Sequence, residues 1–343
     1  MTIAEPPTVR PARWAIVLAF ALVYLCWGTT YLAIRVGVQS FPPFLFGGTR
    51  IACAGLVMLL FLALRGERLS ISGAELLWSA ATAFFLFVLG NGLITAGEQS
   101  VESGMASVLV ATTPIWAALI EMCWPHGDRL TVRGWLGLFV GLGGVCLLVS
   151  SELQKPNQVV HYSGLILVVT SSMAWAVGGS ILRHRRQHNA HFSTTAYQMI
   201  IGGLSLTAAG VAFGETEQLD WESVTPGAIY SFFHLLIFGS LLGYVAYVWL
   251  LRHVTVNKAA TYAYVNPVVA LIVGCVIGDE AFRWVTVAGM IIVLAGVGLV
   301  RTGERPAQAE LPSDALPRST PATVAATHYA HSPQRLECPQ RKG

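Results

Sequence analysis

Long apolar runs recur along this chain of 343 residues, and they constrain its fold more than any other feature. A helix needs roughly 20 largely apolar residues to cross the about 30 Å of hydrocarbon in a bilayer. We expect ten such helices, at residues 14–35, 44–64, 76–97, 103–123, 133–151, 162–182, 193–213, 227–251, 258–277 and 284–301. The predicted fold class is therefore an all-α integral membrane protein with ten transmembrane helices.

Charged residues are scarce, which agrees with lipid as the main solvent. Asp, Glu, Lys and Arg make up 11% of the chain, whereas a soluble domain carries about 25%. The net charge of +3 is scattered over the ends of the apolar runs, so we expect no nucleic-acid partner. The six cysteines show no C-x-x-C spacing, and we expect no metal site and no cofactor.

Lys and Arg lie mainly at alternate ends of the ten runs, and cytoplasmic loops are the ones enriched in these residues. One set of ends carries Arg10, Arg13, Arg65, Arg68, Arg129, Arg133, Arg183, Arg185, Arg186, Arg252, Lys258, Arg301 and Arg305. The opposite set carries only Arg35, Lys155 and Arg283. We therefore expect both termini to lie in the cytoplasm.

An internal repeat divides the ten runs into two sets of five. The aligned pairs include Trp27 with Trp175, Arg50 with Gln198, Gly90 with Gly243 and Pro114 with Pro267. The shift is 148 residues for the first two pairs and 153 for the last two. Because five is an odd number, the second repeat enters the membrane from the opposite side. Such inverted repeats are a recurrent plan of secondary transporters.

The repeat predicts four segments of the chain. Residues 1–13 form a cytoplasmic N-terminal tail, and residues 14–151 form the first five-helix repeat. Residues 162–301 form the second, inverted repeat. Residues 302–343 are rich in Pro, Ala, Ser, Thr and charge, so we expect a disordered cytoplasmic tail there.

Both repeats resemble the EamA family of the drug/metabolite transporter superfamily. The resemblance rests on Trp27 and Gly28, the region of Arg50, the small-residue run ending at Thr113 and Pro114, its counterpart NKAATYAYVNPVVALIVG at 257–274, and the glycine-rich fifth and tenth helices. It implies a multi-pass permease of the bacterial inner membrane that exports or exchanges amino acids, other metabolites or toxic compounds. It also implies a central cavity lined mainly by the first, third, fourth, sixth, eighth and ninth helices.

Aromatic and polar residues lie near mid-depth in those six helices. We expect them to line a substrate cavity at Trp27, Asn91, Thr113, Trp175, Tyr244, Tyr262 and Asn266. The two tryptophans lie too deep for an interfacial belt, so they either fill the core or present aromatic faces to a solute.

Glycines and prolines at the same depth are candidate hinges, since proline removes a backbone hydrogen bond and glycine lets backbones approach. The candidates are Gly90, Pro114, Gly243 and Pro267. Ordinary helix packing is the alternative, because both residue types are common in membrane helices.

Two basic side chains are candidates for a structural or gating role. Arg50 lies well inside the second run, where a charge is costly unless it faces protein or water. It either serves function, forms a structural ion pair or snorkels toward the outer headgroups. His234 either couples protons or packs through a hydrogen bond. Glu98 and Glu121 lie near run ends and are expected at the interfaces, so the coupling ion stays open.

The predicted function is a transmembrane transporter, secondary-active or facilitative, for efflux or exchange of small metabolites or drugs. Alternating access would occur around a cavity between the two repeats. An intramembrane enzyme and a membrane receptor or scaffold are the alternatives. Ser240 follows His234 by six residues on one helix, which is poor geometry for a nucleophile and base, so we expect no enzyme. The expected partners are a small-molecule substrate and the lipid bilayer; a monomer is expected, with a dimer as the alternative.

Overall fold

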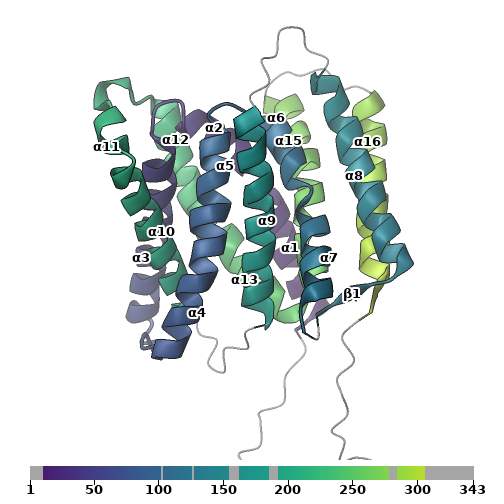
Figure 1. Cartoon of the computed structure of the whole chain (residues 1–343), viewed down its shortest axis with the longest axis horizontal. Coiled ribbons are helices and arrows are strands. Elements are labelled where there is room, and N and C mark those ends of the chain that lie inside the picture. The colour runs from purple at the N-terminus through teal and green to yellow at the C-terminus, as the bar shows by residue number, and fades with distance from the viewer. Residues whose placement is uncertain are drawn as a thin grey trace, which may run out of the picture. The chain divides into compact units, whose positions relative to one another are not determined.

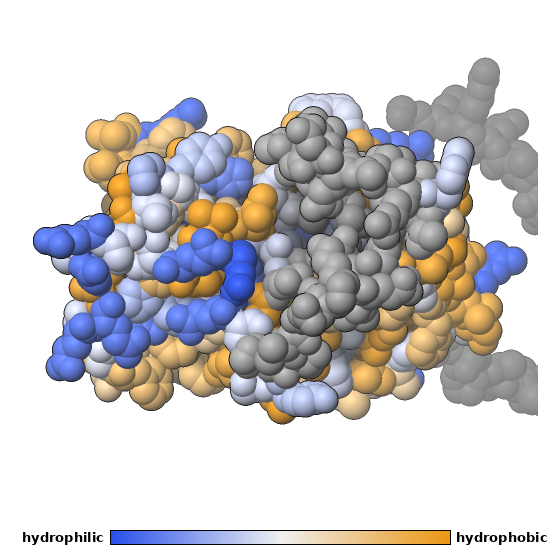
Figure 2. Space-filling view, turned by 90° about the horizontal axis from the view of Figure 1, so that it is seen from above, coloured by the Kyte–Doolittle hydropathy of each residue, from blue (hydrophilic) through white to orange (hydrophobic). Residues whose placement is uncertain are grey.

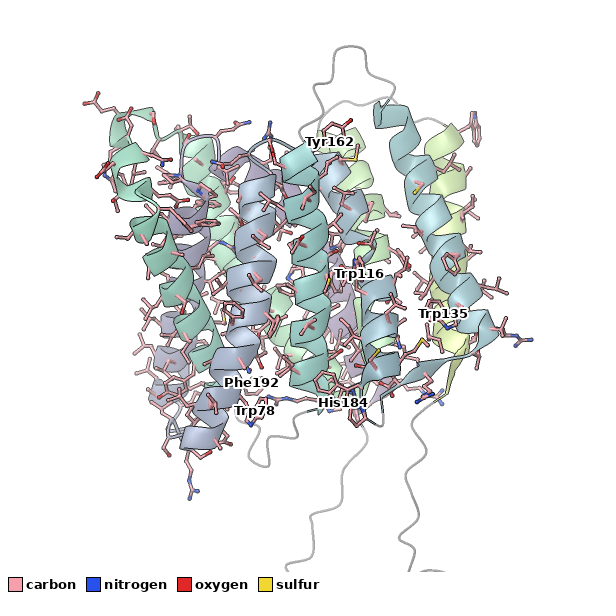
Figure 3. The ribbon with its side chains drawn as sticks, viewed as in Figure 1. Trp78, Trp116, Trp135, Tyr162, His184 and Phe192 are labelled. Carbon is pink, nitrogen blue, oxygen red and sulfur yellow. The ribbon has the colours of Figure 1, made fainter. Side chains whose placement is uncertain are left out.

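The computed structural model describes residues 11–101, 103–125, 127–153, 162–184, 192–277 and 284–305. These residues form a bundle of helices that run nearly side by side (Figure 1). The predicted tails lie almost wholly outside the described residues. We call the end of the bundle at Tyr162 the upper end and the end at His184 the lower end, as they stand in Figure 3.

Five transmembrane segments come from the first repeat. They are α1 (Arg13–Gly28) with α2 (Thr30–Gly37); α3 (Pro43–Leu64); α4 (Gly73–Ala83), the π-helix η1 (Phe84–Asn91) and α5 (Gly92–Gly97); α6 (Ser103–Val110) with α7 (Thr113–Cys123); and α8 (Val132–Leu153), preceded by strand β1 (Arg129–Leu130).

The second repeat follows the same order. Its elements are α9 (Tyr162–His184); α10 (Phe192–Ala212), with the short α11 (Glu215–Gln218) and the 3-10 helix η2 (Trp221–Ser223); α12 (Pro226–His234), the π-helix η3 (Leu235–Tyr244) and α13 (Val245–His253); α14 (Val256–Ala260) with α15 (Tyr262–Ile277); and α16 (Trp284–Thr302), followed by strand β2 (Glu304–Arg305).

Six helical stretches among the described residues are long and apolar enough to cross a bilayer. They are Arg13–Gly37, Pro43–Leu64, Gly73–Gly97, Tyr162–His184, Phe192–Ala212 and Pro226–His253. Each agrees with a predicted span to within three residues at both ends. The other four predicted spans correspond to α6 with α7, α8, α14 with α15, and α16. The all-α membrane fold in two repeats is therefore confirmed.

Helix starts follow from local capping residues. Ser72 and Glu75 form a capping box before α4: the Ser72 hydroxyl accepts from the Glu75 amide at 3.2 Å, and the Glu75 carboxylate accepts from the Ser72 amide at 2.7 Å. Thr225 caps α12 in a similar way, accepting from the Ala228 amide at 3.2 Å. These contacts fix where the third and eighth transmembrane segments begin.

Glycines allow close packing between helices that occupy the same position in the two repeats. The second helices, α3 and α10, pack so closely that a methyl group on Gly203 would lie 2.3 Å from the Ala52 nitrogen. The fifth helices, α8 and α16, are equally close, since a methyl group on Gly296 would lie 2.5 Å from the Gly141 nitrogen. This packing of small residues is typical of membrane helices. Strands β1 and β2 extend the second pair, with Arg129 opposite Arg305.

The surface agrees with a bilayer environment. Large apolar side chains on the flanks are exposed, for example Leu60, Leu77 and Ile166. Hydrophilic residues gather over part of the upper end, where the atoms are not covered in grey (Figure 2). Figure 3 places Phe192 at the lower end and Tyr162 at the upper end, and both side chains are exposed. Aromatic side chains at the two ends are typical of the interfaces with lipid headgroups.

Candidate functional site

A cavity of about 90 Å³ lies between the repeats, near the middle of their helices. Its walls come from α1 and α2, α3, η1 and α5, α6 and α7, α9, η3 and α15. All seven predicted cavity residues line it: Trp27, Asn91, Thr113, Trp175, Tyr244, Tyr262 and Asn266. Gly90 and Arg50 line it as well, whereas Pro114, Gly243, Pro267 and His234 are not among its lining residues.

Four aromatic rings pack together at the lower side of this cavity. Trp27 meets Trp175 edge to face, with ring centroids 5.3 Å apart and planes at 86°. Trp27 also meets Tyr262 at 4.7 Å and Tyr247 at 5.1 Å. Its indole nitrogen donates to the Gly239 carbonyl at 3.0 Å. These contacts hold the rings in fixed positions, and edge-to-face pairs are favourable beyond the area they bury.

Each tryptophan packs on a glycine of the other repeat. A methyl group on Gly243 would lie 2.4 Å from the Trp27 indole nitrogen, and one on Gly90 would lie 2.9 Å from Trp175 Cε3. Both glycines lie in π-helical segments, η1 and η3. Single π turns often mark functional sites in helices. The two glycines therefore admit the rings that close the cavity from below.

The prolines differ in their surroundings although they match in sequence. Pro114 lies in the first turn of α7, directly after the break between α6 and α7. The Thr113 hydroxyl donates to the Val110 carbonyl at 2.6 Å across that break. Pro267 lies inside the continuous helix α15, and the break in that segment comes earlier, at Thr261.

Arg50 is buried in the cavity wall, with 4% of its surface exposed. Its Nη1 donates to the Ser240 hydroxyl at 3.0 Å and its Nη2 to the Asn91 amide oxygen at 2.8 Å. Its Nε has no hydrogen-bond partner in the described part of the chain. Its repeat partner Gln198 instead accepts from the Tyr244 hydroxyl at 2.9 Å. Arg50 therefore neither snorkels toward an end of the bundle nor pairs with a described carboxylate.

Asn266 adds unused polar atoms to the wall. Its side chain is fully buried beside Tyr31, yet neither amide atom reaches hydrogen-bonding geometry with a described residue. Buried polar atoms without partners are rare in native structures. The polar neighbour that the described residues offer them is the Tyr31 hydroxyl.

His234 lies above the cavity, at the junction of α1 and α2. Its Nε2 lies 2.9 Å from the Thr29 hydroxyl. The ring also contacts Tyr230 and Phe238, with centroids 5.9 and 5.0 Å away. The observed contacts are those of a side chain that packs between helices.

Glu121 forms several side-chain contacts at the lower end of the bundle. This carboxylate is fully buried and lies 2.7 Å from His184 Nε2. It also accepts from the Ser180 hydroxyl at 2.7 Å and from the Asp128 amide at 3.0 Å. Nearby, the Tyr24 hydroxyl lies 2.9 Å from the Thr261 hydroxyl. These contacts join α7, α9, α1 and the Thr261 break below the cavity.

Charged groups beside Glu121 are also largely buried. Burial raises the pKa of Asp128, and the positive charge of Arg183 partly opposes that shift. Arg183 donates to the Leu251 carbonyl at 3.2 Å, which ties α9 to α13. Glu121 was expected at the interface; it lies near a helix end, but inside the protein.

The upper end contains a second buried carboxylate. Glu98 follows the last residue of α5 and is fully buried, and neither carboxylate oxygen has a partner among the described residues. Arg35 donates to the backbone carbonyls of Glu98 and Gln99. Burial raises the pKa of Glu98 well above its usual range, although the charge of Arg35 opposes this. The interfacial position expected for Glu98 thus becomes a buried one.

Sequence reasoning missed several small polar residues of the wall. Ser171 and Ser172 line the cavity, and they lie four and three residues before Trp175 on the same helix face. Ser240 lies three residues before Gly243. The helical spacing to the predicted residues is the signal that could have found them.

Comparison with known proteins agrees with this architecture. A curated relative, the uncharacterized inner membrane transporter YedA of Escherichia coli strain K12, is 34% identical over 290 residues, covering 83% of this chain and 90% of the relative. The uncharacterized transporter YoaV of Bacillus subtilis strain 168 is 27% identical over 287 residues, covering 82% and 95%. A protein known by its crystal structure matches with a TM-score of 0.67 at 17% identity, over 85% of this chain and 98% of its own.

The family profile covers both repeats. It matches residues 13–150 and again residues 162–302, which together make up most of the chain. The two matches correspond to the two sets of helices that enclose the cavity. The chain belongs to the EamA-like transporter family and is a multi-pass membrane transporter.

Proposed function

We propose that this transporter moves a small metabolite or drug across the bacterial inner membrane by alternating access, in the direction of efflux or exchange. The proposal is carried by one observation: a cavity near the middle of the helices has walls from both repeats. Inverted repeats supply two arrangements of similar energy that face opposite sides. Transport is secondary-active or facilitative, since the sequence contains no P-loop for ATP.

The lower end is the cytoplasmic end in this proposal. Support comes from Lys and Arg, which cluster at the run ends that meet there. Both termini are then cytoplasmic, and residues 14–151 and 162–301 act as the two repeats. We propose a monomer as the working unit, since helices of both repeats of one chain meet around the cavity.

The described conformation corresponds to a state closed toward the cytoplasm. The lining residues extend from the tryptophans to Tyr31, Ile34 and Ile94 in the upper half of the bundle. Below the tryptophans, the Glu121 contacts and the Tyr24–Thr261 hydrogen bond join the helices. We propose that opening toward the cytoplasm breaks these contacts.

The helix irregularities are the proposed bending points. Gly90 and Gly243 lie in π-helical segments, and Pro114 follows a helix break. Pro267 lacks the backbone hydrogen bond that other residues of α15 donate. Bending at these four positions would let each repeat move around the bound solute.

Flux into proteoliposomes tests the proposal. Purified protein is reconstituted and screened with amino acids and cationic drugs, with and without a pH gradient. We expect flux of at least one solute, and lower flux in Trp27→Ala, Trp175→Ala and Asn266→Ala at equal amounts of folded protein. Trp14→Ala is the matched control, because Trp14 lies on the same helix as Trp27 but is 70% exposed. Unchanged flux in all three cavity variants would contradict the proposal.

A further inference from the structure

Among the described residues that line the cavity, Arg50 is the one charged side chain, and it is a cation. The lining residues include Arg50 but no Asp, Glu, Lys or His. Arg50 is 4% exposed, and its hydrogen-bond partners Ser240 and Asn91 are both neutral. A buried charge without a counter-charge is unfavourable. In a membrane protein such a residue is a functional candidate by default.

No described carboxylate supplies the missing negative charge. Glu121 contacts His184 at the lower end of the bundle, away from Arg50. Glu98, at the upper end, interacts with Arg35. The groups that η1 and η3 present to Arg50 are Asn91, Ser240 and the backbone of Gly239. The described residues of the wall therefore supply no counter-charge to Arg50.

The guanidinium of Arg50 has N–H groups that make no hydrogen bond to a described residue. It carries five N–H groups in a planar fork. The Ser240 hydroxyl takes one from Nη1, the Asn91 oxygen takes one from Nη2, and Nε is unpartnered. The fork matches the two oxygens of a carboxylate. One carboxylate also balances one guanidinium, whereas a phosphate monoester, with a charge of about −1.5 to −2, would leave excess negative charge.

The rest of the wall suits an apolar body. Trp27, Trp175 and Tyr262 form its lower side, and Leu235 and Ile94 contribute from other helices. Apolar pockets with a few placed polar groups are the common form of small-molecule sites. The buried amide of Asn266, beside Tyr31, adds a second polar group to the wall.

We propose that the solute carries a carboxylate, which binds Arg50, and an apolar body, which packs on Trp27, Trp175 and Tyr262. This inference rests on the proposed transport function and narrows its substrate class to small organic acids, including zwitterionic amino acids. Cationic drugs without an acidic group are excluded, because they would add a second positive charge beside Arg50.

The inverted repeat supplies a well-matched test variant. Gln198 occupies the position in α10 that Arg50 occupies in α3, and it is fully buried there with a hydrogen bond to Tyr244. Arg50→Gln therefore removes the charge and keeps a side chain that the fold accepts at the equivalent place. Arg50→Lys keeps the charge but loses the fork. Arg65→Gln is the control, since Arg65 follows the same helix and is exposed.

Thermal unfolding of the purified protein in detergent measures binding without relying on flux. Matched probe pairs are phenylacetate with phenylacetamide, isovalerate with isovaleramide, and leucine with leucinamide; phenethylamine and phenyl phosphate are added singly. We expect the acids to stabilise the wild-type protein at concentrations about tenfold or more below those of the amides, as for a hydrogen bond to a charged group. Arg50→Gln should lose this preference, Arg50→Lys should keep part of it, and Arg65→Gln should keep all of it.

Several outcomes would overturn the inference. They are equal stabilisation by acids and amides, stabilisation by phenethylamine or phenyl phosphate alone, an unchanged preference in Arg50→Gln, or no stabilisation by any acid. Transport itself is judged separately by the proteoliposome screen. Flux of neutral or cationic solutes without acid binding would retain the transport function and reject the carboxylate.

Discussion

Trp27 and Trp175, which occupy the same position in the two repeats, meet edge to face with ring centroids 5.3 Å apart. Each also packs on the glycine that its partner repeat places in a π-helical segment. The two repeats thus interlock, in that each tryptophan packs on a glycine of the other repeat, at the lower side of the cavity. Any movement of one repeat against the other must change this contact, so it is a natural place for a gate.

The hydrogen bond of Trp27 holds the ring against η3. In Trp27→Phe the ring remains, but the Gly239 carbonyl loses this donor. Because Gly239 lies within the helical ladder of η3, its carbonyl is not left unsatisfied, and we expect a loss of about 0.5 to 1.5 kcal/mol of stability, the net contribution of a typical hydrogen bond. Thermal unfolding in detergent measures this, with Trp14→Phe as the control. A melting temperature equal to that of the control would show that the bond does not stabilise the bundle.

The two π-segment glycines should tolerate alanine poorly. Gly243→Ala places a methyl group 2.4 Å from the Trp27 indole nitrogen, and Gly90→Ala places one 2.9 Å from Trp175. We expect each to destabilise the protein by about 1 to 3 kcal/mol through overpacking, with Gly243→Ala the more severe. Gly143→Ala is the control, because a methyl group there meets nothing within 4 Å. Equal melting temperatures for the three variants would disprove the interlock.

Glu98 should make stability depend on pH. Burial raises its pKa well above the usual range, so the folded chain holds a proton that the unfolded chain loses at about pH 4.3. The contribution of Glu98 to stability is therefore fully present below about pH 4.3 and falls as the pH rises toward the raised pKa of Glu98. Glu98→Gln keeps a neutral side chain and should flatten this fall.

Melting temperatures measured from pH 4 upward test this expectation. Glu67→Gln is the control, since Glu67 is exposed near the lower end of α3. A buried neutral Glu98 would be refuted if the melting temperature of the wild-type protein varied with pH as little as that of Glu98→Gln. It would also be refuted if Glu67→Gln reduced the pH dependence of the melting temperature as much as Glu98→Gln does.

Much of the fold could be predicted because the bilayer sets the length of a span. The predicted span 44–64 corresponds to α3 (Pro43–Leu64), which begins one residue earlier. Mid-depth residues such as Asn91 and Thr113 could be placed in the cavity because depth follows from position along a span. The choice of the six helices that line the cavity came from the resemblance to the EamA family.

Contacts between side chains could not be predicted in the same way. Depth alone does not tell which helix face meets protein, so Glu98 and Glu121 were assigned to interfaces although both are fully buried. The neutral partners of Arg50 come from two other helices, far away in sequence. The π-helical segments place Gly90 and Gly243 against tryptophans of the other repeat, and no local sequence pattern reports such contacts.

Alternating access is the central claim, and two-sided labelling of one cavity position tests it most directly. Ser171→Cys places a thiol in the cavity wall of a protein whose other cysteines are replaced. Labelling uses a membrane-impermeant thiol reagent on right-side-out and inside-out vesicles. Glu121→Gln with His184→Ala removes the ion pair of the lower end.

We predict reaction from the periplasmic side in the parent protein, and from the cytoplasmic side as well once the lower contacts are removed. Reaction from the same single side in both proteins, or from neither side, would contradict alternating access around this cavity.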